Sequence, residues 1–176
     1  MKERGAMKTE LRLAKDTDLD TVISIIEDAR HFLAISGSDQ WQHSPYPARS
    51  DLAQDIFLGF GYLFIVDHQI AGYVALISGE NPYYDKLSHG KWLESETGEI
   101  IEIGRMALLS DYRGRGLSKA FYQSIFTLAF RKNYKDLRLW THPKNSVQQH
   151  LFLREGFKKV GILDFEGERW AYQKLL

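Results

Sequence analysis

The chain has 176 residues, 23 Lys and Arg against 23 Asp and Glu, a formal net charge of zero, and no cysteine. This length fits one domain with a single substantial core, and the balanced charge disfavours binding to nucleic acid or to an anionic membrane. The absence of cysteine excludes disulfides, thiolate metal sites and a cysteine acyl-enzyme.

The N-terminal half predicts alternating strands and helices. Alternating polar and apolar residues favour a strand at 10–14, and apolar residues at helical spacing favour an amphipathic helix at 18–35 that ends at Gly37. The elements expected next are an aromatic-rich loop at 38–50, a short helix at 50–58, and a hairpin of strands at 62–66 and 71–78.

The C-terminal half begins, after a long loop at 79–98, with a largely apolar segment at 99–109. This segment fits a central strand that is buried on both faces. A helix begins near Leu117 and carries two apolar stripes, so it packs on more than one side. The elements expected after it are a strand at 136–141, a helix at 146–154, and strands at 158–163 and 169–175.

The chain shows no pattern that targets it to a membrane. No apolar run approaches the roughly 18 residues that cross a bilayer, and the first residues lack the apolar stretch of a signal peptide. We therefore expect a cytoplasmic protein without a membrane partner. Residues 1–7 are expected to form a flexible extension before one domain at 8–176.

A glycine-containing turn joins the apolar strand to the next helix. Gly114 and Gly116 permit backbone conformations that turn several N–H groups toward one anion, and the helix adds its positive N-terminal end. Arg113 and Arg115 supply guanidinium groups that suit phosphate oxygens. The pattern predicts a phosphate-binding turn, with an ordinary strand-to-helix turn and solvated arginines as the alternative.

Two other nucleotide-binding patterns do not fit this turn. The dinucleotide fingerprint requires Gly or Ala three places after Gly116, where the chain has Lys119. A Walker loop requires Gly-Lys followed by Ser or Thr after four spacer residues, and the sequence contains no such segment.

Residues 111–116 resemble the signature of the GCN5-related N-acetyltransferase (GNAT) superfamily, which is Gln or Arg, two residues, Gly, one residue, then Gly or Ala. Both glycines match, and Asp111 departs at the Gln/Arg position. A second block, from Leu139 through Asn145 to Gly156-Phe157, resembles the late strand, the Asn and the closing helix of that family. The resemblance implies an α/β fold, with a mixed, mostly antiparallel sheet of six to seven strands flanked by helices.

The same resemblance implies which residues hold acetyl-coenzyme A. The glycine turn would hold the pyrophosphate, and the strand before it would bind the pantetheine arm through its backbone. Asn145 would contact the cofactor, with a role as a helix N-cap as the equally weighted alternative. The candidate cofactor residues are Met106, Ala107, Leu108, Arg113, Gly114, Arg115, Gly116, Leu117, Ser118, Asn145 and Phe152.

Glu102 is the candidate catalytic residue. It interrupts an apolar run, and burial raises the pKa of a carboxyl toward neutral pH, where it can accept the proton of an amine. It also lies four residues before Met106, the place of the catalytic Glu in some members of the resembled family. The alternative is a structural ion pair with Arg105 or Arg138.

Phe152 stands where many members of that family have a Tyr that protonates the departing thiolate. A phenyl ring cannot donate a proton. Tyr83, Tyr84, His142 or water could supply it instead.

The resemblance implies that the acceptor pocket lies in the two aromatic-rich loops that precede residue 99. Trp41, Tyr83 and Tyr84 are the candidate substrate residues, with simple packing of the loops as the alternative. The six histidines show no metal-binding spacing with carboxylates, so no metal is expected.

The resemblance implies direct, acetyl-CoA-dependent acetylation of a primary amine on a small molecule or peptide. Phe152 supports the alternative of a module that binds acyl-CoA without transferring the acyl group. The identity of the amine, and the choice between a monomer and a homodimer, are left open by the sequence.

Overall fold

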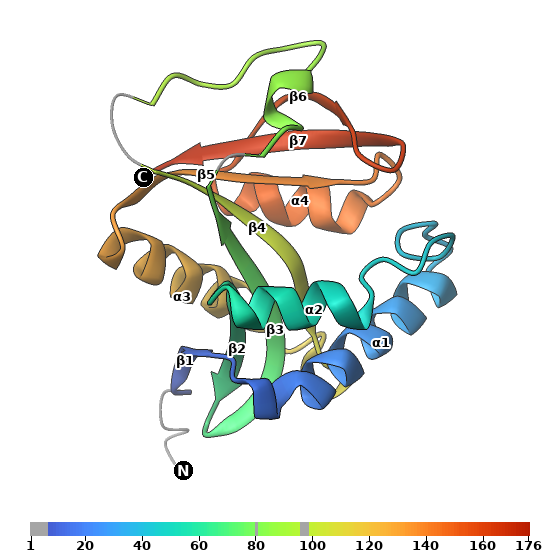
Figure 1. Cartoon of the computed structure of the whole chain (residues 1–176), viewed down its shortest axis with the longest axis vertical. Coiled ribbons are helices and arrows are strands. Elements are labelled where there is room, and N and C mark those ends of the chain that lie inside the picture. Colours follow the sequence, from blue (N-terminus) through green and yellow to red (C-terminus); the bar gives the residue numbers. More distant parts are fainter. Residues whose placement is uncertain (1–6, 80, 96–98) are drawn as a thin grey trace, which may run out of the picture.

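The computed structural model describes residues 7–79, 81–95 and 99–176 (Figure 1). Seven strands form one sheet in the order β1-β2-β3-β4-β5-β7-β6, and all neighbours are antiparallel except the parallel pair β4 and β5. The strands are β1 (Thr9–Leu13), β2 (Gly61–Val66), β3 (Gln69–Ser78), β4 (Glu99–Leu108), β5 (Tyr134–Thr141), β6 (Lys158–Asp164) and β7 (Glu168–Leu175). The longer helices are α1 (Leu19–Ile35), α2 (Arg49–Phe57), α3 (Leu117–Arg131) and α4 (Ser146–Arg154).

The expected fold class and element order are confirmed, with small shifts at the element ends. β3 and β5 each begin two residues earlier than their apolar runs. Gln69 pairs with Val66, and Tyr134 pairs with Glu99, so pairing extends each strand into polar residues. Of the extension expected at 1–7, residues 1–6 lie outside the described residues.

Different helices cover the two faces of the sheet. Along β2, Leu63 and Ile65 pack with α1 and α2, whereas Phe64 and Val66 pack with α3. This arrangement follows from the alternation of side chains along a strand. The Phe121 ring of α3 stacks on Phe64 with 4.2 Å between ring centroids. The core therefore fixes the position of α3, whose first residue follows the glycine turn.

The central strands β4 and β5 diverge along their length (Figure 1). Residues 99–102 of β4 pair with residues 134–138 of β5. Beyond Glu102, β4 stays paired with β3, while β5 stays paired with β7. Where β4 pairs with β3, residues 104–107 of β4 lie opposite residues 73–75 of β3, so β4 has one extra residue and forms a bulge. Arg105 lies in this bulge and has φ +51. The divergence opens the middle of the sheet.

None of the helices in the described ranges is long and apolar enough to cross a membrane.

Replacing the stacked core ring tests this packing. Phe121→Ala should lower the free energy of unfolding by about 3–5 kcal/mol, because the ring is fully buried and its loss leaves a cavity. Phe130→Ala, at a 68% exposed position of the same helix, should cost about 0.5 kcal/mol or less. Urea denaturation measures both; equal losses would contradict the core described here.

Candidate active site

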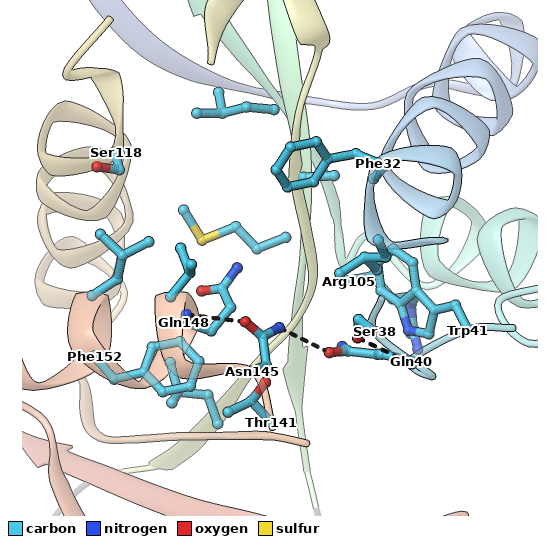
Figure 2. Close-up of a pocket in the computed structure, with 18 of the residues that line it drawn as sticks. Phe32, Ser38, Gln40, Trp41, Arg105, Ser118, Thr141, Asn145, Gln148 and Phe152 are labelled. Atoms are coloured by element: carbon cyan, nitrogen blue, oxygen red, sulfur yellow. Dashed lines mark hydrogen bonds between the residues drawn. The ribbon is translucent and has the colours of Figure 1, made fainter. Parts of the chain in front are cut away.

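A cleft of about 620 Å³ lies where β4 and β5 separate (Figure 2). Its walls come from β4, the end of β5, the first turns of α3 and α4, the end of α1, and the loop between α1 and α2. In Figure 2, Ser118 of α3 lies on one side of the cleft, and Trp41 and Arg105 lie on the other. A cleft of this volume fits a small-molecule site.

The glycine turn has the backbone geometry of an anion site. Gly114 and Gly116 have φ +69 and +73, and no heavy atom lies within 4 Å of a Cβ built on either. Backbone conformation rather than crowding therefore requires glycine here. Gly116 is the N-cap of α3 and has no side chain to cap it, so N–H groups of the first helical turn remain available to an anion. Leu117 and Ser118 begin that helix at the cleft wall.

The two arginines of the turn differ in their surroundings. Arg113 lines the cleft, forms an ion pair with Asp28 of α1, and has its Cζ 4.6 Å from the centroid of the Phe32 ring. Arg115 lies over the Tyr112 ring at 5.4 Å and is exposed. Asp28 also accepts a hydrogen bond from Ser110 N at 3.0 Å, so it ties the turn to α1.

The far half of β4 and the end of β5 face each other across the cleft. Met106, Ala107 and Leu108 all line it, and along this stretch β4 is paired on its β3 edge. Backbone groups on the opposite edge are then left for a ligand. On the β5 side, Thr141 Oγ1 is buried and has no hydrogen-bond partner in the described part of the chain. The sequence analysis did not single out Thr141, since a strand threonine carries no local signal.

Asn145 has the N-cap role that the sequence left open. Its Oδ1 accepts a hydrogen bond from Gln148 N at 3.2 Å, at the start of α4. Its Nδ2 donates to Gln40 Oε1 at 3.1 Å, which links the α1–α2 loop to α4 (Figure 2). Phe152 lies about two turns further along α4, is 5% exposed, and forms an apolar part of the cleft wall.

Glu102 lies in the cleft wall at the last residue of β4 that pairs with β5. Burial raises the pKa of this carboxyl to about 7, although a hydrogen bond from Asn81 Nδ2 at 2.9 Å and the charge of Arg105 oppose the rise. The alternative of an ion pair with Arg105 or Arg138 is not supported, because Arg105 pairs with Asp55 and Arg138 pairs with Asp136.

A buried hydrogen-bond network holds Arg105. Its guanidinium donates to both carboxylate oxygens of Asp55, at 2.8 and 2.5 Å, and to the Tyr46 hydroxyl at 2.6 Å. Tyr73 donates to the same carboxylate at 2.9 Å. Burial alone would lower the pKa of Arg105, but Asp55 raises it above its usual value. Asp55 was missed in the sequence, although its place between Leu52 and Ile56 on a buried helix face was a usable signal.

Only one of the three aromatic residues expected to bind the substrate lines the cleft. Trp41 lines the cleft as predicted, whereas Tyr83 and Tyr84 are not among its lining residues. Tyr84 is 8% exposed and packs against Trp92. Tyr83 packs edge-on against Phe165, with 5.0 Å between the ring centroids. The physical reason is that their loop folds onto the sheet at β6, where Ser88 bridges Ile162. Tyr46 and Phe165 line the cleft in their place.

Three side chains were candidates to donate a proton in place of Phe152, and none of them lines the cleft. Tyr83 and Tyr84 pack beside the sheet as described, and His142 is also not among the lining residues. Burial and the charge of Arg169 lower the pKa of His142.

Comparison with known proteins identifies the family. The family model described as the acetyltransferase (GNAT) family matches residues 25–157. A solved GNAT family acetyltransferase from Streptococcus agalactiae is 36% identical, with a TM-score of 0.87 over 96% of this chain and 95% of that chain. Another from Listeria monocytogenes is 22% identical, with a TM-score of 0.77 over 99% of each chain. The chain belongs to the acetyltransferase (GNAT) family, a family of enzymes.

Two further proteins are similar to this chain. PaiA N-acetyltransferase from Thermoplasma acidophilum, solved in complex with coenzyme A, is 18% identical, with a TM-score of 0.69 over 96% of this chain and 99% of that chain. N-acetylaspartate synthetase from Xenopus tropicalis is 30% identical over 70 residues. That match spans 40% of this chain and only 26% of the length of the frog protein.

The raised pKa of Glu102 should appear in the pH dependence of stability. The folded state holds the proton of Glu102 more tightly than the unfolded state does. The free energy of unfolding of the parent therefore falls as the pH rises from 4.5, the ordinary pKa of the carboxyl, to about 7. Glu102→Gln removes this loss of stability. Its free energy of unfolding relative to the parent should therefore rise by about 3 kcal/mol between pH 4 and pH 8, as measured by urea denaturation.

The matched control is Glu99→Gln, which removes an exposed carboxyl from the same strand. A difference between the Glu102→Gln variant and the parent that stays constant from pH 4 to pH 8 would contradict the raised pKa.

Proposed function

We propose that the protein transfers an acetyl group from acetyl-coenzyme A directly to a primary amine of a small molecule or peptide. The observation that carries this proposal is the buried Glu102 carboxyl, with its pKa near 7, in the wall of the cleft that ends at the glycine turn. Acetyl-coenzyme A supplies the acetyl group as a reactive thioester.

The residues of the cleft fit coenzyme A. The N–H groups at Gly114, Gly116 and the start of α3 suit the pyrophosphate. The free edge of β4 at residues 106–108 suits the amides of the pantetheine arm, because it presents backbone groups that lack a strand partner. The unsatisfied Thr141 hydroxyl in the opposite wall offers one more polar contact.

Glu102 is proposed as the base of the reaction. Most primary amines are protonated at neutral pH, and the nitrogen must lose a proton before it can form a bond to the acyl carbon. A carboxyl with a pKa of about 7 is partly ionised there and can accept that proton. The new C–N bond forms as the C–S bond breaks, and coenzyme A leaves as a thiolate that takes a proton from water. The chain has no cysteine to carry the acetyl group between donor and acceptor.

The names of relatives support nitrogen as the acceptor atom. PaiA is called an N-acetyltransferase, and the product in the name of the frog relative, N-acetylaspartate, is an N-acetylated amino acid. A second candidate function, binding of acyl-CoA without transfer, is favoured by Phe152, because this ring cannot protonate a leaving thiolate.

A variant of the glycine turn tests the donor site. Gly116→Glu should weaken acetyl-coenzyme A binding by at least about tenfold, because it places a carboxylate against the pyrophosphate and strains the left-handed backbone. Gly59→Glu is the matched control, since Gly59 also has φ +73 and open space around it but is not a lining residue of the cleft. Isothermal titration calorimetry measures both. A parent protein that does not bind acetyl-coenzyme A would rule out the donor site.

Glu102→Gln tests the base. Turnover should fall by about 100-fold or more, while the dissociation constant of acetyl-coenzyme A stays within about twofold. In the parent, kcat/KM should fall as pH drops below about 7, and the variant should lose this limb. Release of the coenzyme A thiol reports turnover without interference, because the chain contains no cysteine. Equal losses of binding and turnover would point to a structural role for Glu102.

The same assay separates the two candidate functions. Normal acetyl-coenzyme A binding without turnover on any primary amine would favour the binding module over the enzyme.

A further inference from the structure

Arg169 places a partly buried positive charge in the cleft wall. Of the cations that line the cleft, Arg105 pairs with Asp55 and Arg113 pairs with Asp28. Lys144 is exposed to solvent. Arg169 is partly buried, and no ion pair joins it to a carboxylate among residues 7–79, 81–95 and 99–176.

Among the residues that the structure describes, one hydrogen bond from the Arg169 guanidinium is present. Its Nη1 donates to the carbonyl of Glu168 at 2.8 Å, which is one contact for a group with five donors. Burial lowers the pKa of Arg169, and the carboxylates of Glu166 and Asp164 oppose this from beyond ion-pair distance. The Glu166 carboxylate accepts a hydrogen bond from Ser44 Oγ at 3.3 Å. The guanidinium therefore keeps donors for an anion that enters the cleft.

Tyr46 connects this cation to the proposed base. Tyr46, Glu102 and Arg169 all line the cleft. The charge of Glu102 affects the pKa of Tyr46, and the Tyr46 hydroxyl affects the pKa of Arg169, so the base and the cation both lie near this hydroxyl. The Tyr46 oxygen accepts a hydrogen bond from Arg105, which directs the hydroxyl but leaves its own proton free to donate. Phe165 packs edge-on against Tyr46 at 5.7 Å and completes an aromatic wall.

We infer that the acceptor is a primary amine that also carries a carboxylate, as an amino acid does. Its amine lies at Glu102, and its carboxylate lies at Arg169 with the Tyr46 hydroxyl as a second donor. An amine without a carboxylate would leave the guanidinium without a counter-ion, and a polyamine would be repelled by it. This inference rests on the proposed function and names the substrate class of the same site.

Matched acceptors test the inference. We would compare pools of the common amino acids with pools of their amides and of the amines that lack the carboxylate, using release of the coenzyme A thiol. The amino acids should show kcat/KM at least about tenfold above both other pools, because the carboxylate gains charge-assisted hydrogen bonds. Equal or faster reaction of the amides or simple amines would overturn the inference while leaving the acetyltransferase proposal in place.

Arg169→Gln should raise KM for the preferred amino acid by about 10- to 100-fold. It should change kcat by less than about threefold and leave KM for acetyl-coenzyme A unchanged, because the guanidinium holds the acceptor and not the reacting atoms. Arg169→Lys should recover part of the loss, since it restores the charge without the fork. Lys158→Gln, which removes an exposed cation from the neighbouring strand, should change nothing. A uniform loss with every acceptor would overturn the role of Arg169.

Binding tests recognition of the carboxylate apart from the chemistry. Calorimetric titration of the same amino acids into protein saturated with coenzyme A should give binding that Arg169→Gln weakens by at least about tenfold. This result would support the acceptor class even if no acetyl transfer were detected, which would count against the proposed function alone. No binding of any amino acid by the parent protein, together with no turnover of them, would overturn the inference.

Discussion

The strands β4 and β5 separate after Glu102, and the cleft lies in the gap between them. Two adjacent strands that part give up ladder hydrogen bonds, and buried backbone groups without partners cost free energy. Here each strand keeps its other neighbour: β4 stays on β3, and β5 stays on β7. The sheet therefore divides into two halves that remain paired internally. Backbone groups along the gap become available to a ligand instead of to each other.

The same separation accounts for the ionisation of Glu102. At the point where the strands part, Glu102 lies against the cleft, yet it is only 8% exposed. The nearby guanidinium of Arg105 would hold a carboxylate in its charged form, but Asp55 and Tyr46 already occupy its donors. This buried ion pair is expensive to disrupt, since removing one partner costs about 3–5 kcal/mol. Arg105 is thus held in its pair with Asp55, and burial outweighs its charge in setting the pKa of the Glu102 carboxyl.

The sequence predicted those parts of the site that depend on neighbouring residues. Gly114 and Gly116 adopt the left-handed backbone that their spacing suggested, and Asn145 caps α4. The parts that could not be predicted depend on distant residues. The ion pair of Arg113 was not predicted, because its partner Asp28 lies 85 residues earlier, on a helix with no local sign of contact. Tyr83 and Tyr84 were expected in the pocket because of their loop, but the loop folds onto β6.

The two ends of the cleft differ in how far apart their residues lie in the sequence. The proposed donor end is built largely from one continuous stretch, from β4 through the glycine turn to α3, so a short motif can mark it. The proposed acceptor end combines Trp41 and Tyr46 from one loop, Arg105 from a strand bulge, and Phe165 and Arg169 from the β6–β7 hairpin. These segments meet only in the folded chain, so no local pattern records their pairing. Because Asp55 and Asp28 balance the charges of Arg105 and Arg113, the proposed selectivity for the acceptor depends on the partly buried guanidinium of Arg169.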